Sequence, residues 1–480
     1  NKHFLRGMVA GELELNSTVL IVDEVDDLIV NERPNAHYVK VDVERTPALV
    51  KSLAALKLGE GKPGDVPDDI WAKAQRDMNV ANAREENVHY RVIVKEDGKK
   101  AVIQLNNDGQ VPKVPLTSPW LKALQYKLCG DEPTSDSHFA CVCTPYVFNM
   151  YAGIFGLTGS VGGKAELGYL TKTYSAVKFD APRFLDTCMG NARKIVLNHG
   201  VELLDGPEKQ IARVVEIAHK YFRDVPVLII AASSEELTAI HKAVQDGGLV
   251  PADEVQRFSE FDAAGVSMKA EWQTIIDDAT KRIGGQEDNR CRVTITDRFG
   301  GRGHDFQVVD KEANANGGML VIATSIPDER EWIQWKGRTA RQDRPGHFYV
   351  LLDESAPPFT EPSHKTLAAK LRSIAKGGGA GGGDEKSAAD QMVQVMLDVS
   401  DEGIGEKLKA FEGDQASGER LNEITIQYFK KHPRGFDDDW PRQEYMETDM
   451  ILRKLLQENV RSTPAEIKAA AKAKLGLDID

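Results

Sequence analysis

The chain has 480 residues, of which 41% are hydrophobic and 28% charged, which is typical of a globular protein with roughly three domains. Its 61 basic and 74 acidic residues give a net charge of −13, which argues against a nucleic-acid-binding protein because such proteins need clustered cations. Five cysteines do not make a disulfide framework, and no apolar run approaches the roughly 18 residues of a membrane-spanning helix. The chain starts at Asn1 without a secretory pattern, and we expect further residues upstream.

The first predicted element is a buried parallel strand at residues 18–22, which is short, apolar and β-branched. We predict that residues 1–30 and 136–176 form part of a first α/β domain. Residues 31–135 have a different character and are predicted to be a small inserted α/β domain joined to the first by two strands or loops. It contains a helix that begins at Thr46-Pro47 and a β-hairpin that turns at Glu96-Asp97-Gly98.

A second β/α region is predicted over residues 177–356, with strands at 227–231, 292–296, 319–324 and 348–352. Long polar-apolar segments lie between these strands, which is typical of a doubly wound parallel sheet. Residues 357–384 contain a glycine run that predicts a flexible linker, and residues 385–480 are predicted to be helical, with a capping box at Thr463–Glu466. The fold class is therefore α/β, with two parallel-sheet units, an insertion and a helical C-terminal segment.

The first candidate site is the sequence Asp23-Glu24-Val25-Asp26 at the end of the first strand. Ligands of parallel sheets bind beyond the carboxyl ends of the strands. Asp23 can hold Mg²⁺ there, and Glu24 can orient or deprotonate an attacking water. The alternative interpretation is a solvated acidic turn.

A second candidate site is the segment from Gln334 to Gln342, which contains Arg338 and Arg341. Residues three apart share one face of a helix, and two guanidinium groups on one face suit a triphosphate on which negative charge develops. The alternative is an exposed basic helix face.

Two turns offer weaker candidates. The segment Thr296–Asp305, which contains Gly301-Arg302-Gly303-His304-Asp305, directly follows a predicted strand. Its glycines would let the backbone approach a ligand while Arg302 and Asp305 contact it. Thr158-Gly159-Ser160 carries hydroxyl groups that can relay the state of a bound nucleotide. The alternative interpretation of both is an ordinary turn.

The order of these four motifs along the chain resembles superfamily 2 motor ATPases, and in detail it resembles SecA, the preprotein-translocase motor. The family's D-E-V-D, T-G-T, G-R-G-T-D and G-R-x-G-R-Q boxes correspond to Asp23–Asp26, Thr158–Ser160, Gly301–Asp305 and Gly337–Gln342. The insertion between the first two boxes matches the position of SecA's preprotein cross-linking domain. The resemblance covers roughly residues 10–356.

This resemblance implies two RecA-like units that bind ATP and Mg²⁺ between them. Asp23 would serve Mg²⁺ and Glu24 would orient the water, whereas Arg302, Arg338 and Arg341 would act from the second unit. The nucleotide-contacting residues would be Asp23, Thr158, Gly301, Gly303, Asp305 and Gln334.

The sequence also departs from the family. It has no G-x-x-x-x-G-K-[S/T] phosphate-binding loop, which in the family precedes the D-E-V-D box, and His304 and Ala340 replace the family's Thr and Gly. Whether this chain is an enzyme is therefore left open, and we expect the 480 residues alone to bind nucleotide weakly. Two alternatives remain: a superfamily 2 nucleic-acid helicase, and a SecA-like binding module without hydrolysis.

The resemblance implies a preprotein or unfolded polypeptide as the partner, and possible contact with a membrane protein-conducting channel. No nucleic acid is expected, and the oligomeric state is not predicted. The implied location is the bacterial cytoplasm or the plastid stroma, with peripheral attachment to a membrane as an option.

Overall fold

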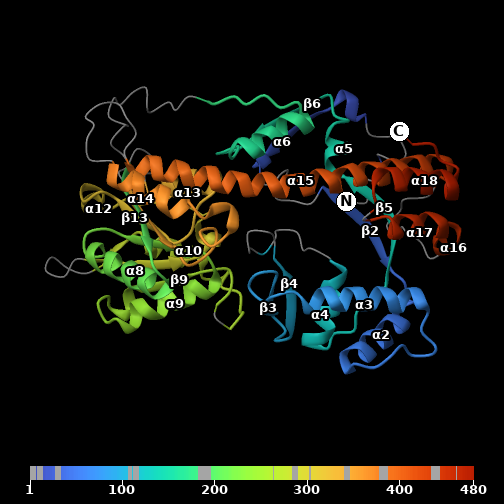
Figure 1. Cartoon of the computed structure of the whole chain (residues 1–480), viewed down its shortest axis with the longest axis horizontal. Helices are drawn as coiled ribbons and strands as arrows, with labels where there is room; N and C mark the ends of the chain where they lie inside the picture. Colours follow the sequence, from blue (N-terminus) through green and yellow to red (C-terminus); the bar gives the residue numbers. More distant parts are fainter. Residues whose placement is uncertain are drawn as a thin grey trace. The chain divides into compact units, whose positions relative to one another are not determined.

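Figure 1 shows the computed structural model of the chain. The structure describes residues 7, 14–26, 34–105, 111, 118–181, 196–262, 264–283, 290–301, 304–339, 346–377, 388–433, 444–460 and 462–479. The chain divides into two compact units: the first comprises residues 1–83, 117–178 and 403–480, and the second comprises residues 84–116 and 179–402.

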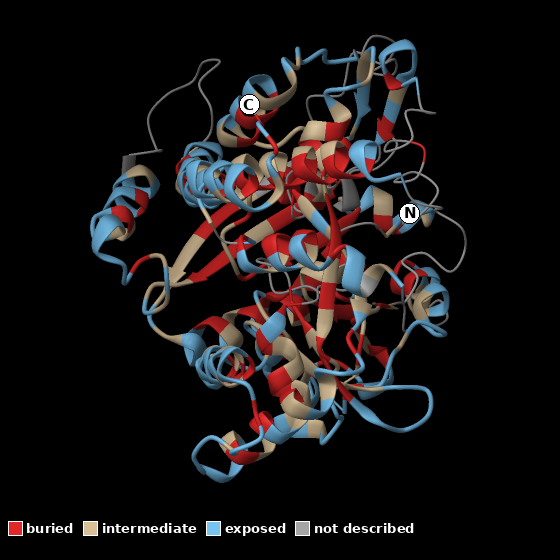
Figure 2. Cartoon of the chain, turned by 90° about the vertical axis from the view of Figure 1, so that its right-hand side faces the viewer, coloured by how far each residue is buried: buried red, intermediate tan, exposed pale blue. Residues whose placement is uncertain are grey.

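The second unit is built on a six-stranded parallel sheet with the strand order β7-β14-β13-β8-β12-β9. Four of these strands confirm the predicted positions, whereas β7 and β9 were not predicted. The inner strands β8 and β13 are entirely apolar, and the buried β12 alternates valine or isoleucine with threonine, because both faces of a parallel sheet are covered. Figure 2 shows the strands of this sheet as largely buried. The strand bounds are β7 Val196–Leu204, β8 Val227–Ile230, β9 Val255–Phe258, β12 Val293–Thr296, β13 Met319–Ala323 and β14 Gly346–Asp353.

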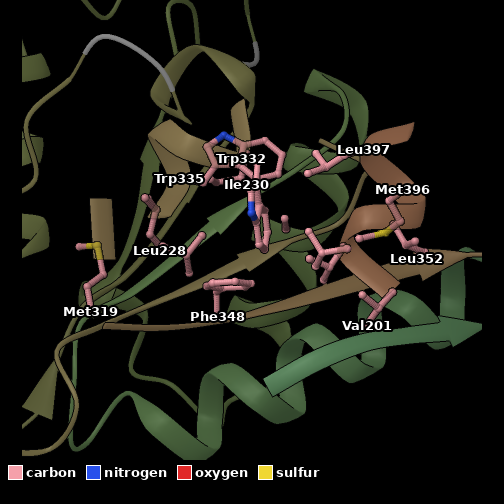
Figure 3. Packing of buried hydrophobic residues seen from close by; sticks show 14 of the residues in the cluster. Val201, Leu228, Ile230, Met319, Trp332, Trp335, Phe348, Leu352, Met396 and Leu397 are labelled. Carbon is pink, nitrogen blue, oxygen red and sulfur yellow. The ribbon is translucent and has the colours of Figure 1, made fainter. Parts of the chain in front are cut away.

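Helices cover both faces of this sheet. On one face, α8 (Pro207–Tyr221) and α9 (Ser234–Asp246) contribute Val214, Ile217 and Leu237 to a buried cluster. On the other face, α13 (Glu329–Thr339) contributes Trp332 and Trp335, which pack over Leu228, Ile230 and Phe348 (Figure 3). These two tryptophans therefore pack α13 onto the sheet. The same cluster includes residues of α10 (Trp272–Ala279), α14 (Leu367–Gly377) and the beginning of α15 (Ala388–Lys431).

The first unit contains the predicted first strand, β1 (Val19–Asp23), paired in parallel with β6 (Gly153–Leu157). The prediction that this strand is buried is wrong for one of its faces: Val22 is 5% exposed, but Val19 is 52% and Ile21 69% exposed. In the described part of the chain this sheet has two strands, and α6 (Lys164–Tyr174) and a later part of α15 pack on the side of Val22.

A separate antiparallel pair in the first unit consists of β2 (Asn35–Val41) and β5 (Asp136–Cys143). These strands lie at the two ends of the predicted insertion, where two connecting strands or loops were expected. Between them in sequence are the helices α2 (Thr46–Leu58), α3 (Asp68–Asn82) and α4 (Pro119–Cys129). Helix α2 begins at the predicted Thr46-Pro47 and ends at Gly59, which adopts a left-handed conformation with φ of 75°.

The predicted hairpin is present as β3 (Tyr90–Val94) and β4 (Lys100–Gln104). It belongs to the second compact unit, whereas α2, α3 and α4 belong to the first. That residues 31–135 form an independent inserted domain therefore stays a prediction, as do the other predicted domain boundaries.

The C-terminal region is helical, as predicted. Helix α15 is followed by α16 (Tyr445–Thr448), α17 (Met450–Glu458) and α18 (Pro464–Leu475), and α18 begins with the predicted Thr463–Glu466 capping box. Of the predicted linker at residues 357–384, the part Leu367–Gly377 forms helix α14, and residues 378–384, which hold most of the glycine run, lie outside the described residues. Within the described part of the chain, each helix is too short or too polar to cross a membrane.

Candidate functional site

The acidic box lies where β1 ends. Asp23 is the last residue of the strand, and the Glu24 amide donates a hydrogen bond to Asp23 Oδ1 at 3.0 Å. Glu24 has a φ of 49°, which is unusual for a residue with a side chain and often occurs at functional sites. Both carboxylates are exposed. They are therefore open to an incoming metal ion or water.

The Thr-Gly-Ser turn follows β6 and contacts the acidic box. Thr158 Oγ1 donates a hydrogen bond to Asp26 Oδ1 and accepts one from the Ser160 amide at 3.1 Å. Asp26 is 1% exposed, so its carboxylate needs such partners. The structure thus brings two predicted motifs together through Asp26. This residue was not a predicted site residue, although its place in the acidic box could have indicated it.

The Gly-rich turn of the second unit begins where β12 ends. Asp297 Oδ1 accepts a hydrogen bond from the Phe299 amide at 3.0 Å and begins the short helix α11 (Arg298–Gly301). A Cβ atom at Gly301 would lie 2.7 Å from Trp335 Nε1. The glycine at this position therefore has a packing reason, and its contact with a nucleotide stays a prediction.

The residues after the turn are partly described. Asp305 is exposed, and its Oδ2 accepts a hydrogen bond from Gln307 Nε2 at 2.7 Å. The His304 ring lies 4.9 Å from the Phe258 ring and 4.7 Å from the Phe299 ring. Where the family has Thr, this chain therefore has a side chain that packs in an aromatic cluster. Arg302 and Gly303 lie outside the described residues.

The predicted arginine helix is α13, and it starts with a capping box in which the Glu331 amide donates to Asp328 Oδ1 at 2.6 Å and the Asp328 amide donates to Glu331 Oε2 at 3.1 Å. Gln334 is half-buried, and its Oε1 has no hydrogen-bond partner among the described residues. The backbone of Arg338 lies one turn further along α13. The Arg338 side chain and all of Arg341 lie outside the described residues.

Glu331 also joins this helix to the Gly-rich turn. Its carboxylate is 1% exposed and lies 3.4 Å from Arg298 Nε. Neither Glu331 nor Arg298 was predicted as a site residue, although the Asp-x-x-Glu spacing of Asp328 and Glu331 is a helix-start signal.

Two further carboxylates lie at strand ends of the second unit. Burial raises the pKa of Glu260, which follows β9, to about 7. Burial also raises the pKa of Asp297, and the nearby Arg91 opposes this shift. Both line a pocket of about 50 Å³ together with Arg91 and Ser233. None of these four residues was predicted as a site residue, although Asp297 lies in the predicted segment Thr296–Asp305.

The predicted magnesium ligand, Asp23, offers a small set of donor atoms. Asp23 is a single exposed carboxylate, and no group of three or more potential metal-binding side chains occurs among the described residues. One carboxylate with bound waters suffices for Mg²⁺ when phosphate oxygens complete the coordination. The donor set at the end of β1 therefore fits Mg²⁺ brought with a nucleotide.

No protein-family model matches this chain. It is 25% identical over 266 residues to the protein translocase subunit SecA of Salinibacter ruber, an alignment that covers 54% of this chain and 20% of that protein. The chain thus spans about a fifth of the length of this curated relative.

Among solved structures, the chain aligns with S. cerevisiae Dbp5 bound to RNA and ADP BeF3, at 16% identity and a TM-score of 0.30, over 51% of this chain and 55% of that one. It also aligns with T. fusca Cas3 with ATP, at 12% identity and a TM-score of 0.30, over 85% of this chain and 38% of that one. The sequence similarity to SecA is in keeping with the predicted resemblance, but it is too low and covers too little of that protein to show the family of this chain.

Proposed function

We propose that this chain is part of a SecA-like motor that couples ATP hydrolysis to the movement of a polypeptide. The observation that carries the proposal is the hydrogen bond between Thr158 and Asp26. It ties the Thr-Gly-Ser turn to the acidic box that contains Asp23 and Glu24, so two motifs of the resemblance, which are 132 residues apart in sequence, are in contact. The sequence similarity to SecA adds support.

The residues of the first unit would perform the chemistry around the attacking water. Asp23 would bind Mg²⁺, which neutralises phosphate charge when the nucleotide is bound. Glu24 would orient and deprotonate the water. Thr158 would transmit a change at the acidic strand end to the turn that follows β6, because its hydroxyl contacts Asp26 directly.

The residues of the second unit would bind the nucleotide and its developing charge. Gly301, Gly303, Asp305 and Gln334 would contact the nucleotide. Arg302, Arg338 and Arg341 would stabilise negative charge as the phosphate is transferred. In support, the ion pair between Arg298 and Glu331 links the Gly-rich turn to the helix of Arg338, so the two arginine-bearing segments are held together.

The moved substrate would be an unfolded preprotein, and a membrane protein-conducting channel is the implied partner. Nucleic acid is not part of the proposal, in keeping with the net charge of −13. The implied site of action is the cytoplasm or the plastid stroma, at or near a membrane.

The test uses the full-length gene product and measures ATP hydrolysis alone, with a permanently unfolded polypeptide, and with single-stranded RNA at low salt. We expect the polypeptide to stimulate turnover and the RNA to leave it unchanged. Stimulation by RNA alone would favour the helicase alternative. An absence of hydrolysis under all three conditions would favour the binding module.

The 480-residue chain by itself provides a matched control. Its sequence has no phosphate-binding loop motif, and the amide nest and lysine of such a loop hold the β- and γ-phosphates. We expect weak nucleotide binding and negligible turnover. Robust hydrolysis by this chain would show that another part of it cradles the phosphates.

A further inference from the structure

The pocket in the second unit lies at the carboxyl ends of three neighbouring strands, β8, β12 and β9. Ser233, Asp297 and Glu260 come from the segments that follow these strands, and Asn87 and Arg91 come from the segment that contains hairpin β3–β4. The hairpin therefore covers the edge of the sheet at which parallel sheets bind ligands.

The hairpin is attached to the second unit by hydrogen bonds outside its own ladder. The Val94 amide donates to the Gly265 carbonyl at 2.9 Å, and Asn87 Nδ2 donates to Glu235 Oε1 at 3.2 Å. Gly265 has a φ of 83°, and a Cβ atom there would lie 2.9 Å from the Val92 carbonyl oxygen. The turn that receives the hairpin thus depends on a glycine for both its conformation and the closeness of the contact.

The segment that receives the hairpin is also held by its own hydrogen bonds. Asp262 Oδ1 accepts hydrogen bonds from the amides of Ala264 and Val266, both at 2.8 Å. The Asp262 amide in turn donates to the Val266 carbonyl at 2.8 Å. These hydrogen bonds hold Asp262, Ala264 and Val266 together beside the hairpin.

Charge acts across the pocket without direct contact. The Nε of Arg91 is buried without a hydrogen-bond partner among the described residues. Its positive charge nevertheless opposes the rise in the pKa of Asp297 and of Glu260. Arg257 also faces Asp297 and Asp262. Arg91 lies on β3 of the hairpin, so its attraction to Asp297 and Glu260 favours the docking of the hairpin.

Asp297 has a second role that connects the pocket to the Gly-rich turn. The carboxylate that faces Arg91 also accepts the Phe299 amide at 3.0 Å, and the Gly301 amide donates to the Asp297 carbonyl at 3.2 Å. A Cβ atom at Gly300 would lie 2.1 Å from Thr296 Oγ1. Because the turn is packed this tightly, a displacement of the Asp297 side chain displaces the turn with it.

We propose that hairpin β3–β4 is a latch on the second unit and that Arg91 is a positioning residue that couples the docking of the latch to the Gly-rich turn through Asp297. The docking stands on the contacts above. Its response to a nucleotide bound near Gly301 rests on the proposed function.

The test measures amide hydrogen exchange of two neighbouring residues by NMR in this chain. The Val94 amide bonds to Gly265 and reports docking, whereas the Lys95 amide bonds to the Lys99 carbonyl at 2.9 Å inside the hairpin and reports the hairpin alone. In Arg91→Met we expect Val94 exchange to rise about five- to tenfold, the scale of one partly buried charge interaction, with Lys95 unchanged. The matched control is Lys100→Met, which removes an exposed positive charge from the same hairpin and should change neither amide.

A second variant tests the coupling. Asp297→Asn should raise the exchange rate of the Val94 amide by a similar factor. In the double variant Arg91→Met/Asp297→Asn, the fold-increase should be smaller than the product of the two single-variant increases, because both residues act through one interaction. The latch would be overturned if the Val94 exchange rate stayed unchanged in the variants, or if the Val94 and Lys95 rates rose together. It would also be overturned if the double-variant increase equalled the product of the single-variant increases.

An experiment with ATP distinguishes a failure of this proposal from a failure of the proposed function. In the full-length product, ATP binding is first established by equilibrium dialysis, and Val94 exchange is then compared with and without ATP. A bound nucleotide that leaves Val94 exchange unchanged overturns the coupling. A failure of ATP to bind counts against the proposed function, and the variants of Arg91 and Asp297 then decide the latch.

Discussion

Strand β1 ends with an aspartate and strand β12 is followed directly by one, but the two carboxylates lie in opposite surroundings. Asp23 ends β1 in a two-stranded sheet of the described chain and is exposed. Asp297 follows β12 inside a six-stranded sheet, and burial raises its pKa. The same chemical group at the same topological position is thus open to solvent in one unit and enclosed by protein in the other.

The comparison teaches that position at a strand end does not by itself define a role. An exposed carboxylate can exchange water for a metal ion at little cost, which suits Asp23 as a magnesium ligand. An enclosed carboxylate must be balanced by nearby donors and charges, which suits Asp297 as a structural link between Phe299, Arg91 and the Gly-rich turn.

The largest effect is expected from Glu24→Gln in the full-length product. A residue that orients or deprotonates the attacking water contributes about 10²- to 10⁴-fold to the rate, so turnover should fall by that factor while ATP binding stays within about twofold. Because Glu24 is exposed, the melting temperature should not change. The control is Glu60→Gln, which neutralises another exposed glutamate of the first unit. A fall of less than tenfold would contradict the assigned role.

Acid should destabilise the first unit through an enclosed histidine pair. The rings of His37 on β2 and His138 on β5 lie 5.0 Å apart, and burial lowers the pKa of His37 from 6.5 to about 4 and that of His138 to about 3. Burial thus lowers the pKa of these bases, whereas it raises the pKa of the acid Asp297.

The direction of this pH effect follows from the linkage between protonation and folding. The folded unit holds both histidines neutral, whereas the unfolded chain protonates them below about pH 6.5. The folded state is therefore fully stable with respect to these groups above pH 6.5 and loses stability as the pH falls toward about 4. Each histidine should cost on the order of 1 kcal/mol per pH unit in that window. Hydrogen exchange of β5 amides at pH 7.5 and pH 5 measures the effect. The double variant His37→Asn/His138→Asn should lose most of this pH dependence, and an equal dependence in both proteins would refute the assignment.

The sequence predicted the second unit's sheet well because its strands are continuous apolar runs, as in β8 and β13. It missed β7, whose sequence contains Asn198, His199 and Gly200, and β9, whose sequence contains Gln256 and Arg257. These strands lie at the two edges of the sheet. Edge strands have fewer buried neighbours, and they therefore lack the apolar pattern that identifies inner strands.

The site was predictable only in part, for a related reason. Motif residues such as Asp23 and Thr158 could be identified from their order along the chain, but their connection runs through Asp26 and could not. The pocket residues Arg91, Ser233, Glu260 and Asp297 come from four separate segments. Sequence spacing contains no signal for such a group, because only the folded sheet brings the four segments together.

A matched pair of glycine variants tests how tightly the two sheets are packed. At Gly300, beside Asp297, a Cβ atom would lie 2.1 Å from Thr296 Oγ1 and 2.6 Å from Phe258 Cδ1, whereas at Gly153, the first residue of β6, it would meet nothing within 4 Å. Gly300→Ala should lower the free energy of unfolding by about 1–3 kcal/mol, as overpacking does. Gly153→Ala should change it by less than about 1 kcal/mol. Urea unfolding followed by tryptophan fluorescence measures both, and equal losses would show that the first sheet is packed like the second.

The smallest effect is expected on the exposed face of β1, and it decides how far the two sheets differ. Val19 is 52% exposed and Val22 is 5% exposed, so one strand offers the same residue on both of its faces. Replacement of Val by Thr keeps the shape and the strand preference and adds one hydroxyl group. In Val19→Thr that hydroxyl stays in water, and the free energy of unfolding should change by less than about 0.5 kcal/mol.

In Val22→Thr the hydroxyl is placed against Val25, Tyr169 and Leu170, which belong to the same buried cluster. Burial of a hydroxyl without a partner costs about 1–3 kcal/mol in protein variants. Urea unfolding of the 480-residue chain gives both values. If Val19→Thr costs as much as Val22→Thr, then the face of β1 that carries Val19 and Ile21 is covered in solution. The contrast between an open first sheet and an enclosed second sheet would then be wrong, and the exposed setting of Asp23 would need a new explanation.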